Sequence, residues 1–100
     1  MTELTSKTRK QLEKLAHELN PVVIIGQNGV TDSLVRMVSD SLEAHELIKV
    51  KFNEYKDDKF EYSEDIAMRT NSTLVRIIGN IAIFYKENDD PEKRRIKIKA

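Results

Sequence analysis

The sequence predicts an α/β (α+β) fold with the element order α-β-α-β-α-β-β, in which helices pack on a mixed four-stranded sheet in two layers. Apolar runs of strand length recur at 22–25, 48–52, 73–78 and 81–86. A segment with apolar residues at helical spacing precedes each of the first three runs. The first two strands and the helix between them fit a parallel βαβ unit, whereas the last two runs fit a hairpin. A parallel start and an antiparallel end together require a mixed sheet.

Length and composition limit the class of protein. The chain has 100 residues, of which 39% are hydrophobic and 34% are charged. We therefore expect residues 1–100 to form a single domain, with an acidic turn and a basic tail at 87–100. Without cysteine there is neither a disulfide framework nor a cysteine-based metal site. No apolar stretch approaches the roughly 20 residues that span a bilayer, and the polar residues at the start do not suggest a signal peptide. We expect a cytoplasmic protein without a membrane partner.

The first helix is expected to begin at a cap on Thr5 or Ser6 and to run to about Leu19, because Asn20-Pro21 interrupts it. Apolar residues at helical spacing predict its buried face, which consists of Leu12, Leu15, Ala16 and Leu19. Basic residues lie on the opposite side, namely Lys7, Lys10, Lys14 and His17. This stripe is a candidate surface for a polyanion, although such stripes are more commonly solvated helix faces.

The most distinctive stretch is the strand Val22–Ile25 with the loop Gly26-Gln27-Asn28-Gly29 that follows it. Both glycines can take a positive φ and can let another backbone approach closely. Thr31 is a candidate N-cap, and Asp32 suits the positive end of a helix that runs to about Glu43. The backbone N–H groups of such a loop and helix start can bind a phosphate. A tight turn without a ligand is the alternative, because a lone G-x-x-G is not specific.

The middle of the chain predicts a strand and a third helix. The strand at 48–52 alternates apolar and basic residues, so one of its faces should be covered. A polar loop at 53–59 overlaps the start of the helix, which runs from about Asp58 to Thr70. The expected core residues of this helix are Phe60, Ile66 and Ala67. Asn71 suits a left-handed position at its end.

The C-terminal part predicts a hairpin and a tail. Gly79-Asn80 between two apolar runs suits a type II′ hairpin turn. An acidic turn with one proline follows at 87–92. The alternating tail at 94–99 is expected either to add a short edge strand or to remain mobile.

Few side chains converge in a way that suggests catalysis. The histidines, His17 and His45, have no metal-binding spacing. No serine stands in G-x-S-x-G, and the glycine loop is neither a Walker A motif nor a dinucleotide fingerprint. Acidic residues cluster near the third helix start, at Asp57, Asp58, Glu61, Glu64 and Asp65. A metal site there is less expected than stabilisation of the helix dipole. We expect no enzyme, metal site, cofactor or small-molecule substrate.

Charge is segregated along the chain. Seventeen basic and seventeen acidic residues give a net charge of zero, which alone does not suggest nucleic-acid binding. Residues 51–92 nevertheless hold ten of the acids, and the last eight residues hold five bases and no acid. Segregation of this kind can place a basic face on a neutral molecule.

Several segments of the chain carry a family resemblance. They are Leu4-Thr5-Ser6-Lys7, the stretch from Leu15 to Thr31, His45-Glu46-Leu47-Ile48-Lys49-Val50, Val75-Arg76-Ile77-Ile78-Gly79, and Tyr85. Together they resemble the CRM domain (chloroplast RNA splicing and ribosome maturation), most closely its stand-alone bacterial YhbY type. The resemblance implies a fold like the C-terminal domain of bacterial translation initiation factor three. It also implies non-catalytic binding to ribosomal RNA in precursors of the large subunit.

One departure from the family shapes the expected site. Family loops often carry a base between the glycines, whereas Gln27 and Asn28 are neutral. We expect the first helix to supply the missing charge if it packs beside the loop. The expected RNA-binding residues are Gly26, Gln27, Asn28, Gly29, Thr31, Lys7, Arg9, Lys10 and Lys14, with Arg94, Arg95 and Lys97 as an extension. The three tyrosines are too far apart in the sequence to predict a platform on which bases could stack. They are Tyr55, Tyr62 and Tyr85.

A function of a different class remains open. The acidic middle of the chain, with residues such as Asp57 and Glu64, would repel RNA. A protein-interaction module that docks on a ribosomal protein or an assembly factor would tolerate these charges. Binding that survives nuclease treatment would distinguish this alternative from RNA binding.

Overall fold

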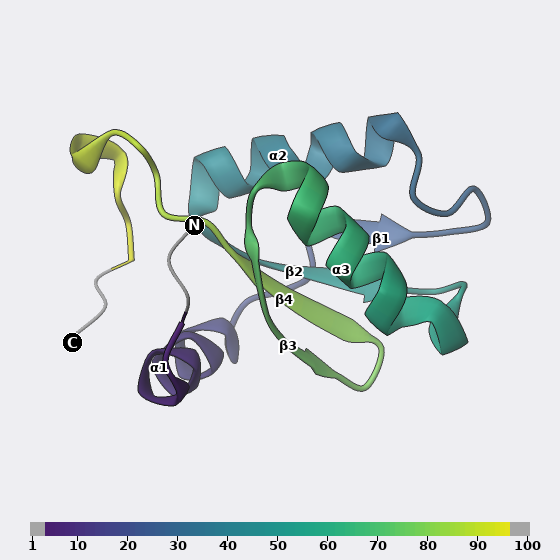
Figure 1. Ribbon diagram of the computed structural model, residues 1–100, viewed down its shortest axis with the longest axis horizontal. Coiled ribbons are helices and arrows are strands. Elements are labelled where there is room, and N and C mark those ends of the chain that lie inside the picture. Colours follow the sequence, from purple (N-terminus) through teal and green to yellow (C-terminus); the bar gives the residue numbers. More distant parts are fainter. Residues whose placement is uncertain (1–3, 97–100) are drawn as a thin grey trace.

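The computed structural model describes residues 4–96. Its helices are α1 (Ser6–Ala16), α2 (Asp32–His45) and α3 (Lys59–Thr70), and its strands are β1 (Val23–Ile25), β2 (Leu47–Phe52), β3 (Thr73–Ile78) and β4 (Ile81–Tyr85). The strands form one sheet in the order β1-β2-β4-β3 (Figure 1). β1 runs parallel to β2, and β4 is antiparallel to both of its neighbours. The predicted element order and the mixed four-stranded sheet are confirmed.

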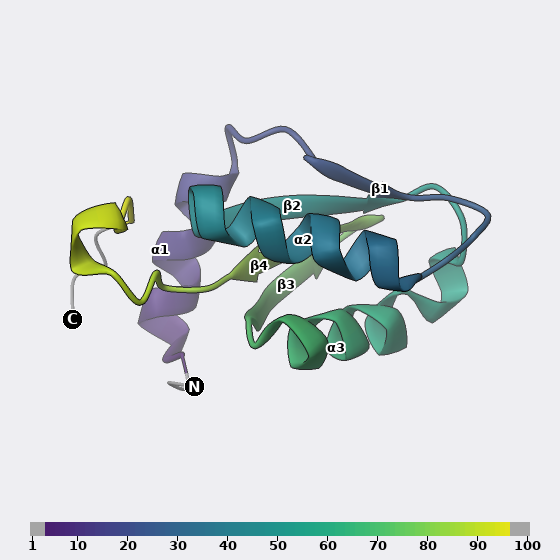
Figure 2. The same cartoon turned by 90° about the horizontal axis from the view of Figure 1, so that it is seen from above.

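Helices cover the two faces of this sheet unequally (Figure 2). α2 and α3 pack on one face, over a core that includes Ile25, Val38, Leu42, Ile48, Phe52, Ile66 and Phe84. α1 crosses one end of the other face, where a smaller cluster consists of Leu12, Ala16, Leu47, Val75, Ile83 and Tyr85. Alternate residues of β2 and β4 point to opposite faces, so one strand can serve both clusters. The predicted two layers describe the sheet with α2 and α3, and α1 adds a partial third layer.

The end of α1 differs from the prediction. The helix stops at Ala16 rather than at Leu19. The Nζ of Lys49 donates to the carbonyls of His17 and Leu19 at 3.4 and 3.0 Å, which satisfies backbone oxygens that a longer helix would use itself. The expected burial of Leu15 and Leu19 is wrong, because these side chains are 47% and 38% exposed. α1 contacts the sheet only along a narrow stripe, so helical spacing overestimates its buried face.

α3 begins at Lys59, one residue from the expected start, and ends at Thr70 as expected. A 3-10 turn, Lys56–Asp58, occupies the expected loop and leads directly into the helix. Ile66 and Ala67 are buried as expected. The expected burial of Phe60 is wrong, because it is 61% exposed in the first turn of the helix, beyond the body of the core.

Besides Gly29, four of the described residues have a positive φ. Two are expected: Asn71 has φ 58° at the end of α3, and Gly79 has φ 59° in the β3–β4 hairpin. The other two could not be predicted from residue type, because neither is a glycine or an asparagine. Glu46 has φ 64° and Tyr55 has φ 56°. Such a conformation is uncommon for these residue types and requires support from the surrounding structure.

Buried Glu46 receives that support from the C-terminal segment. Its carboxylate accepts hydrogen bonds from the backbone N–H groups of Asn88 at 2.6 Å, Ile96 at 2.9 Å and Arg95. Ile96 packs against the cluster under α1. The described part of the tail, through Ile96, therefore lies against the α1 end of the molecule and does not form the edge strand that we considered. The predicted site residue Lys97 lies outside the described residues.

Candidate nucleic-acid interface

The glycine loop forms a tight turn between β1 and α2. The N–H of Gly29 donates to the carbonyl of Gly26 at 3.0 Å, and Gly29 has φ 68°. Thr31 caps α2 as predicted, since its Oγ1 accepts from the N–H of Leu34 at 3.1 Å. Between the glycines, Gln27 and Asn28 are exposed at the tip of the turn. The loop thus presents two neutral polar side chains and the start of a helix to solvent.

The two glycines have different roles. A Cβ added to Gly26 would meet no atom within 4 Å, and φ of Gly26 lies outside the left-handed region. A Cβ on Gly29 would lie 3.4 Å from Cε2 of Tyr55, and its positive φ would also be strained. Gly29 is therefore required by the turn itself. Gly26 leaves open space beside the loop, so it is the residue at which another backbone can approach.

Tyr55 contacts the loop through both its hydroxyl and its ring. Its Oη donates to the carbonyl of Gln27 at 2.5 Å, and its ring lies beside Gly29. The ring also packs on Tyr62, with centroids 5.3 Å apart and planes at 42°. Sequence reasoning missed this pair. The parallel β1–β2 pairing contained a signal for it, because residues that follow β1 and β2 meet at the same edge of the sheet. The N–H groups of Asn53 and Glu54 donate to the carbonyl of Ile25 at this edge.

The charges around the loop are mixed. Asp32, at the start of α2, pairs with Arg69 of α3 at 2.5 Å, so its negative charge is partly compensated. Desolvation, with a further contribution from the carboxylate of Asp58, raises the pKa of Tyr62 above its ordinary value. Carboxylates therefore lie near the tyrosine pair. The loop end carries these acids together with Arg69 and the exposed Lys51, so it is less uniformly basic than the α1 stripe.

The basic stripe of α1 lies at the other end of the sheet (Figure 1). Lys7, Lys10 and Lys14 are exposed, as predicted. The helix contacts the end of the sheet that includes Leu47, whereas the loop follows the opposite end of β1. The expectation that α1 could pack beside the loop is therefore wrong, because the chain between them spans the length of β1.

The remaining predicted basic residues are also at the α1 end. Arg9 does not extend into solvent, since its Nη1 donates to the carbonyls of Leu74 and Val75 at 2.9 and 2.7 Å. Arg94 pairs with Glu87 at 3.3 Å, and the exposed Arg95 is adjacent in the tail. The structure therefore brings the tail together with α1 and leaves the glycine loop apart from both.

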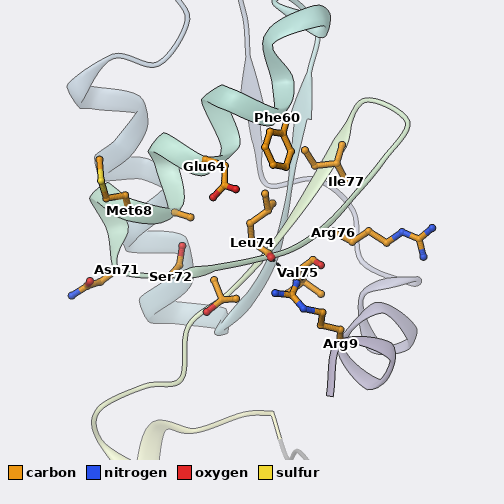
Figure 3. A pocket seen from close by; sticks show the side chains of 12 residues that line it. Arg9, Phe60, Glu64, Met68, Asn71, Ser72, Leu74, Val75, Arg76 and Ile77 are labelled. Carbon is orange, nitrogen blue, oxygen red and sulfur yellow. Dashed lines mark hydrogen bonds between the residues drawn. The ribbon is translucent and has the colours of Figure 1, made fainter. Parts of the chain in front are cut away.

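A groove of about 710 Å³ lies between α3 and β3 (Figure 3). Leu74 and Ile77 of β3 line it together with Phe60 and Met68 of α3, which are 61% and 72% exposed. Glu64 adds an acidic group to the lining, and Arg9 and Arg76 add two basic groups. The groove is thus partly apolar and carries charges of both signs.

Residues 4–96 offer neither a metal site nor a membrane-spanning helix. No group of three or more His, Cys, Asp or Glu side chains in this range could hold a metal ion. No helix in the same range has the length and apolar character needed to cross a membrane.

Together, the helix-flanked mixed sheet and the G-x-x-G turn at a helix start define a small α/β domain with an exposed glycine loop. The model of the CRS1 / YhbY (CRM) domain family matches residues 4–86, and the chain belongs to this family. The predicted family is thereby confirmed.

Relatives and a solved structure agree with this assignment. A probable RNA-binding protein of Pseudomonas aeruginosa is 35% identical over 91 residues, covering 90% of this chain and 88% of the relative. Probable RNA-binding protein YqeI of Bacillus subtilis is 36% identical, covering 87% of this chain and 92% of the relative. The solution structure of a hypothetical Staphylococcus aureus protein, to which RNA binding is ascribed, matches with TM-score 0.77 and 34% identity, covering 95% of this chain and all of that one.

Proposed function

We propose that this protein is a non-catalytic RNA-binding protein that contacts ribosomal RNA in precursors of the large subunit. Its family and the names of its relatives support RNA binding. The ribosomal target follows from the resemblance to the stand-alone bacterial members of the family. The observation that carries the proposal is the open space beside Gly26, the first residue of the G-x-x-G turn.

The loop acts through close approach rather than through charge. A phosphate or ribose can approach the turn at Gly26 because no side chain stands there. Gln27 and Asn28 offer hydrogen bonds at the exposed tip, and neither carries a charge. Tyr55 fixes the position of the loop carbonyl of Gln27. This arrangement favours contact with the sugar-phosphate backbone, so we do not expect base-specific recognition by the loop.

The basic stripe of α1 supplies the electrostatic attraction. Lys7, Lys10 and Lys14 face solvent on one helix. Lysines that neutralise phosphates release counterions, which makes affinity dependent on salt. Because the longest dimension of the molecule is 38 Å and the stripe and the loop lie at opposite ends, one RNA must extend along the protein to reach both. Structured RNA or an extended single strand meets this requirement.

A substitution at Gly26 tests the proposal. Gly26→Asp fits sterically and places a negative charge where the phosphate would approach, so we expect RNA affinity to fall about tenfold. Ala44→Glu is the matched control, because it adds the same charge at an exposed position of α2 far from the loop. Binding to transcribed large-subunit ribosomal RNA would be measured by filter binding, with thermal melts to verify folding. Equal affinity of a folded Gly26→Asp variant and the parent would reject the loop as a contact.

The ribosomal target requires a separate experiment. Crosslinking in cells, followed by sequencing of the attached RNA, should recover sequences of large-subunit precursors. Recovery of unrelated RNA with equal frequency would reject the ribosomal assignment and would leave general RNA binding intact.

Docking on a ribosomal protein or an assembly factor is the second candidate function. The groove with exposed Phe60 and Met68 favours it, because clustered exposed apolar side chains often mark protein contacts. Capture of a specific protein that survives nuclease treatment, and that fails with Met68→Gln, would support this function. A partner that is lost with nuclease would contradict it.

A further inference from the structure

One face of the sheet is uncovered next to the glycine loop. The register places Ile24 of β1, Lys51 of β2, Ile81 of β4 and Ile78 of β3 in one row across all four strands. Ile24 and Ile78 are 54% and 53% exposed, and Lys51 is exposed as well. α2 and α3 pack on the opposite face, and α1 covers only the far end of this one (Figure 2). The row is therefore an apolar surface with a lysine in it.

The side of the molecule that carries this row and α1 is mostly basic. The bases on α1 and on this face are Lys7, Arg9, Lys10, Lys14, Lys49, Lys51 and Arg76, and the acid among them is Glu13. The opposite side is acidic, since α2 and α3 carry Asp32, Asp40, Glu43, Glu61, Glu64 and Asp65 against Arg36, Lys59 and Arg69. The neutral chain is thus electrostatically two-sided, and a polyanion is attracted to the side of the open sheet face.

The position of the row connects the two separated parts of the candidate interface. Ile24 and Lys51 lie one residue before Ile25 and Phe52, after which β1 leads into the glycine loop. At the other end of the same face, Arg76 pairs with Glu13 of α1 at 2.7 Å. A chain that lies on the open face would therefore pass from α1 to the loop without crossing the acidic helices.

We propose that the open sheet face, with Ile24, Lys51, Ile78 and Ile81, binds a single-stranded segment of the RNA. This inference rests on the proposed function and specifies its surface and the form of its ligand. Lys51 would contact a phosphate, and the isoleucines would contact bases. Apolar side chains can reach the faces of bases only where these are unpaired, which favours a single strand over a duplex. Charge favours RNA over a protein ligand, because Lys51 stands in the row and the same face continues to the basic side chains of α1.

Two variants test this proposal. Lys51→Gln should weaken binding of a labelled single-stranded RNA of about 12 nucleotides roughly threefold, and should lower the slope of log affinity against log salt by about 0.7. Ile24→Thr with Ile78→Thr keeps β-branched residues in the strands. This double variant should weaken single-strand binding about fivefold, with an unchanged salt slope and unchanged binding of a duplex of equal length.

Matched controls lie on the acidic side. Arg36→Gln on α2 removes one positive charge, and Met68→Gln on α3 removes an exposed apolar side chain; both should leave binding within about twofold of the parent. If the Lys51 and isoleucine variants bind as the parent does while Gly26→Asp loses affinity, the open face is not the RNA surface and the proposed function stands. If Gly26→Asp and a variant with Lys7, Lys10 and Lys14 exchanged for Gln also bind as the parent does, the proposed function fails as well. Loss of duplex binding alone would overturn the single-strand assignment.

Discussion

The two ends of this sheet differ in what each offers to RNA under the proposed function. At the α1 end, charge is concentrated on one helix that a small cluster around Leu12 attaches to the sheet. At the loop end, charge is nearly balanced, and a backbone turn is fixed by a single tyrosine. Electrostatic attraction of RNA is therefore expected from α1, and close approach of the RNA backbone is expected at the loop. Substitutions in one element should weaken its own contribution and leave that of the other element intact.

The largest expected effect tests the attachment of α1. Leu12 is fully buried, so Leu12→Ala should lower the free energy of unfolding by about 3 kcal/mol. Leu15→Ala, three residues along the same helix, is the control, and it should cost less than about 1 kcal/mol because Leu15 is 47% exposed. Urea denaturation of both variants measures the difference. Equal losses would contradict the orientation of α1.

The second prediction concerns pH at the α1 end. Desolvation by burial, with a contribution from Glu87, raises the pKa of Tyr85 to about 12. Since an unfolded tyrosine ionises near 10, this stabilising contribution is complete below about pH 10 and is lost between about pH 10 and 12. The loss should be on the order of 2 kcal/mol. Tyr85→Phe has no ionisable hydroxyl and should not show this loss. Between about pH 8 and pH 11, the free energy of unfolding measured in urea should therefore fall more in the parent than in the variant. Parallel losses in both proteins would contradict the assignment.

The third prediction removes charge without changing the loop. Exchanging Lys7, Lys10 and Lys14 for Gln should weaken RNA binding about thirtyfold, close to 2 kcal/mol. The slope of log affinity against log salt should fall by about 2, because about 0.7 is lost for each single-strand phosphate contact. Binding titrations at several salt concentrations measure both quantities. An unchanged slope would remove α1 from the interface.

The fourth prediction changes the loop without changing charge. Tyr55→Phe keeps the ring beside Gly29 and loses the hydrogen bond to the carbonyl of Gln27, which should cost about 1 kcal/mol. RNA affinity should fall about fivefold with an unaltered salt slope. Tyr62→Phe keeps the hydrogen bond of Tyr55 and serves as the control. If both variants bind alike, Tyr55 does not position the loop.

The smallest expected effect concerns the charge next to the loop. The side chain of Asp32 is 98% exposed, so its pair with Arg69 contributes little to stability. Asp32→Asn removes a negative charge near the loop and should strengthen RNA binding about twofold. Asp40→Asn, farther along α2, should have no effect on affinity. Equal gains in both variants would show that net charge, rather than position, determines affinity.

The sequence predicted the order of elements well because their patterns are local. The alternation in β2, the cap at Thr31 and the left-handed Asn71 all depend on neighbours within a few residues. The errors at Leu15 and Phe60 arose because helical spacing identifies an apolar stripe but not how much of it another element covers.

The candidate site was less predictable, because it depends on which segments meet in space. Gly26 and Gly29 were recognisable, whereas Tyr55 reaches the loop only through the parallel pairing of β1 with β2. The separation of α1 from the loop was accessible in principle. α1 precedes the start of β1 and the loop follows its end, so the strand must stand between them.

Arg9 has a consequence for the behaviour of shortened forms of the protein. β3 is one of the two edge strands of the sheet, and Arg9 donates to its carbonyls at Leu74 and Val75. An uncovered edge strand can pair with the edge of another molecule. We therefore expect a chain trimmed to begin after α1 to associate through β3 and to elute as a larger species at high concentration. Absence of that larger species would show that Arg9 does not protect the edge of β3.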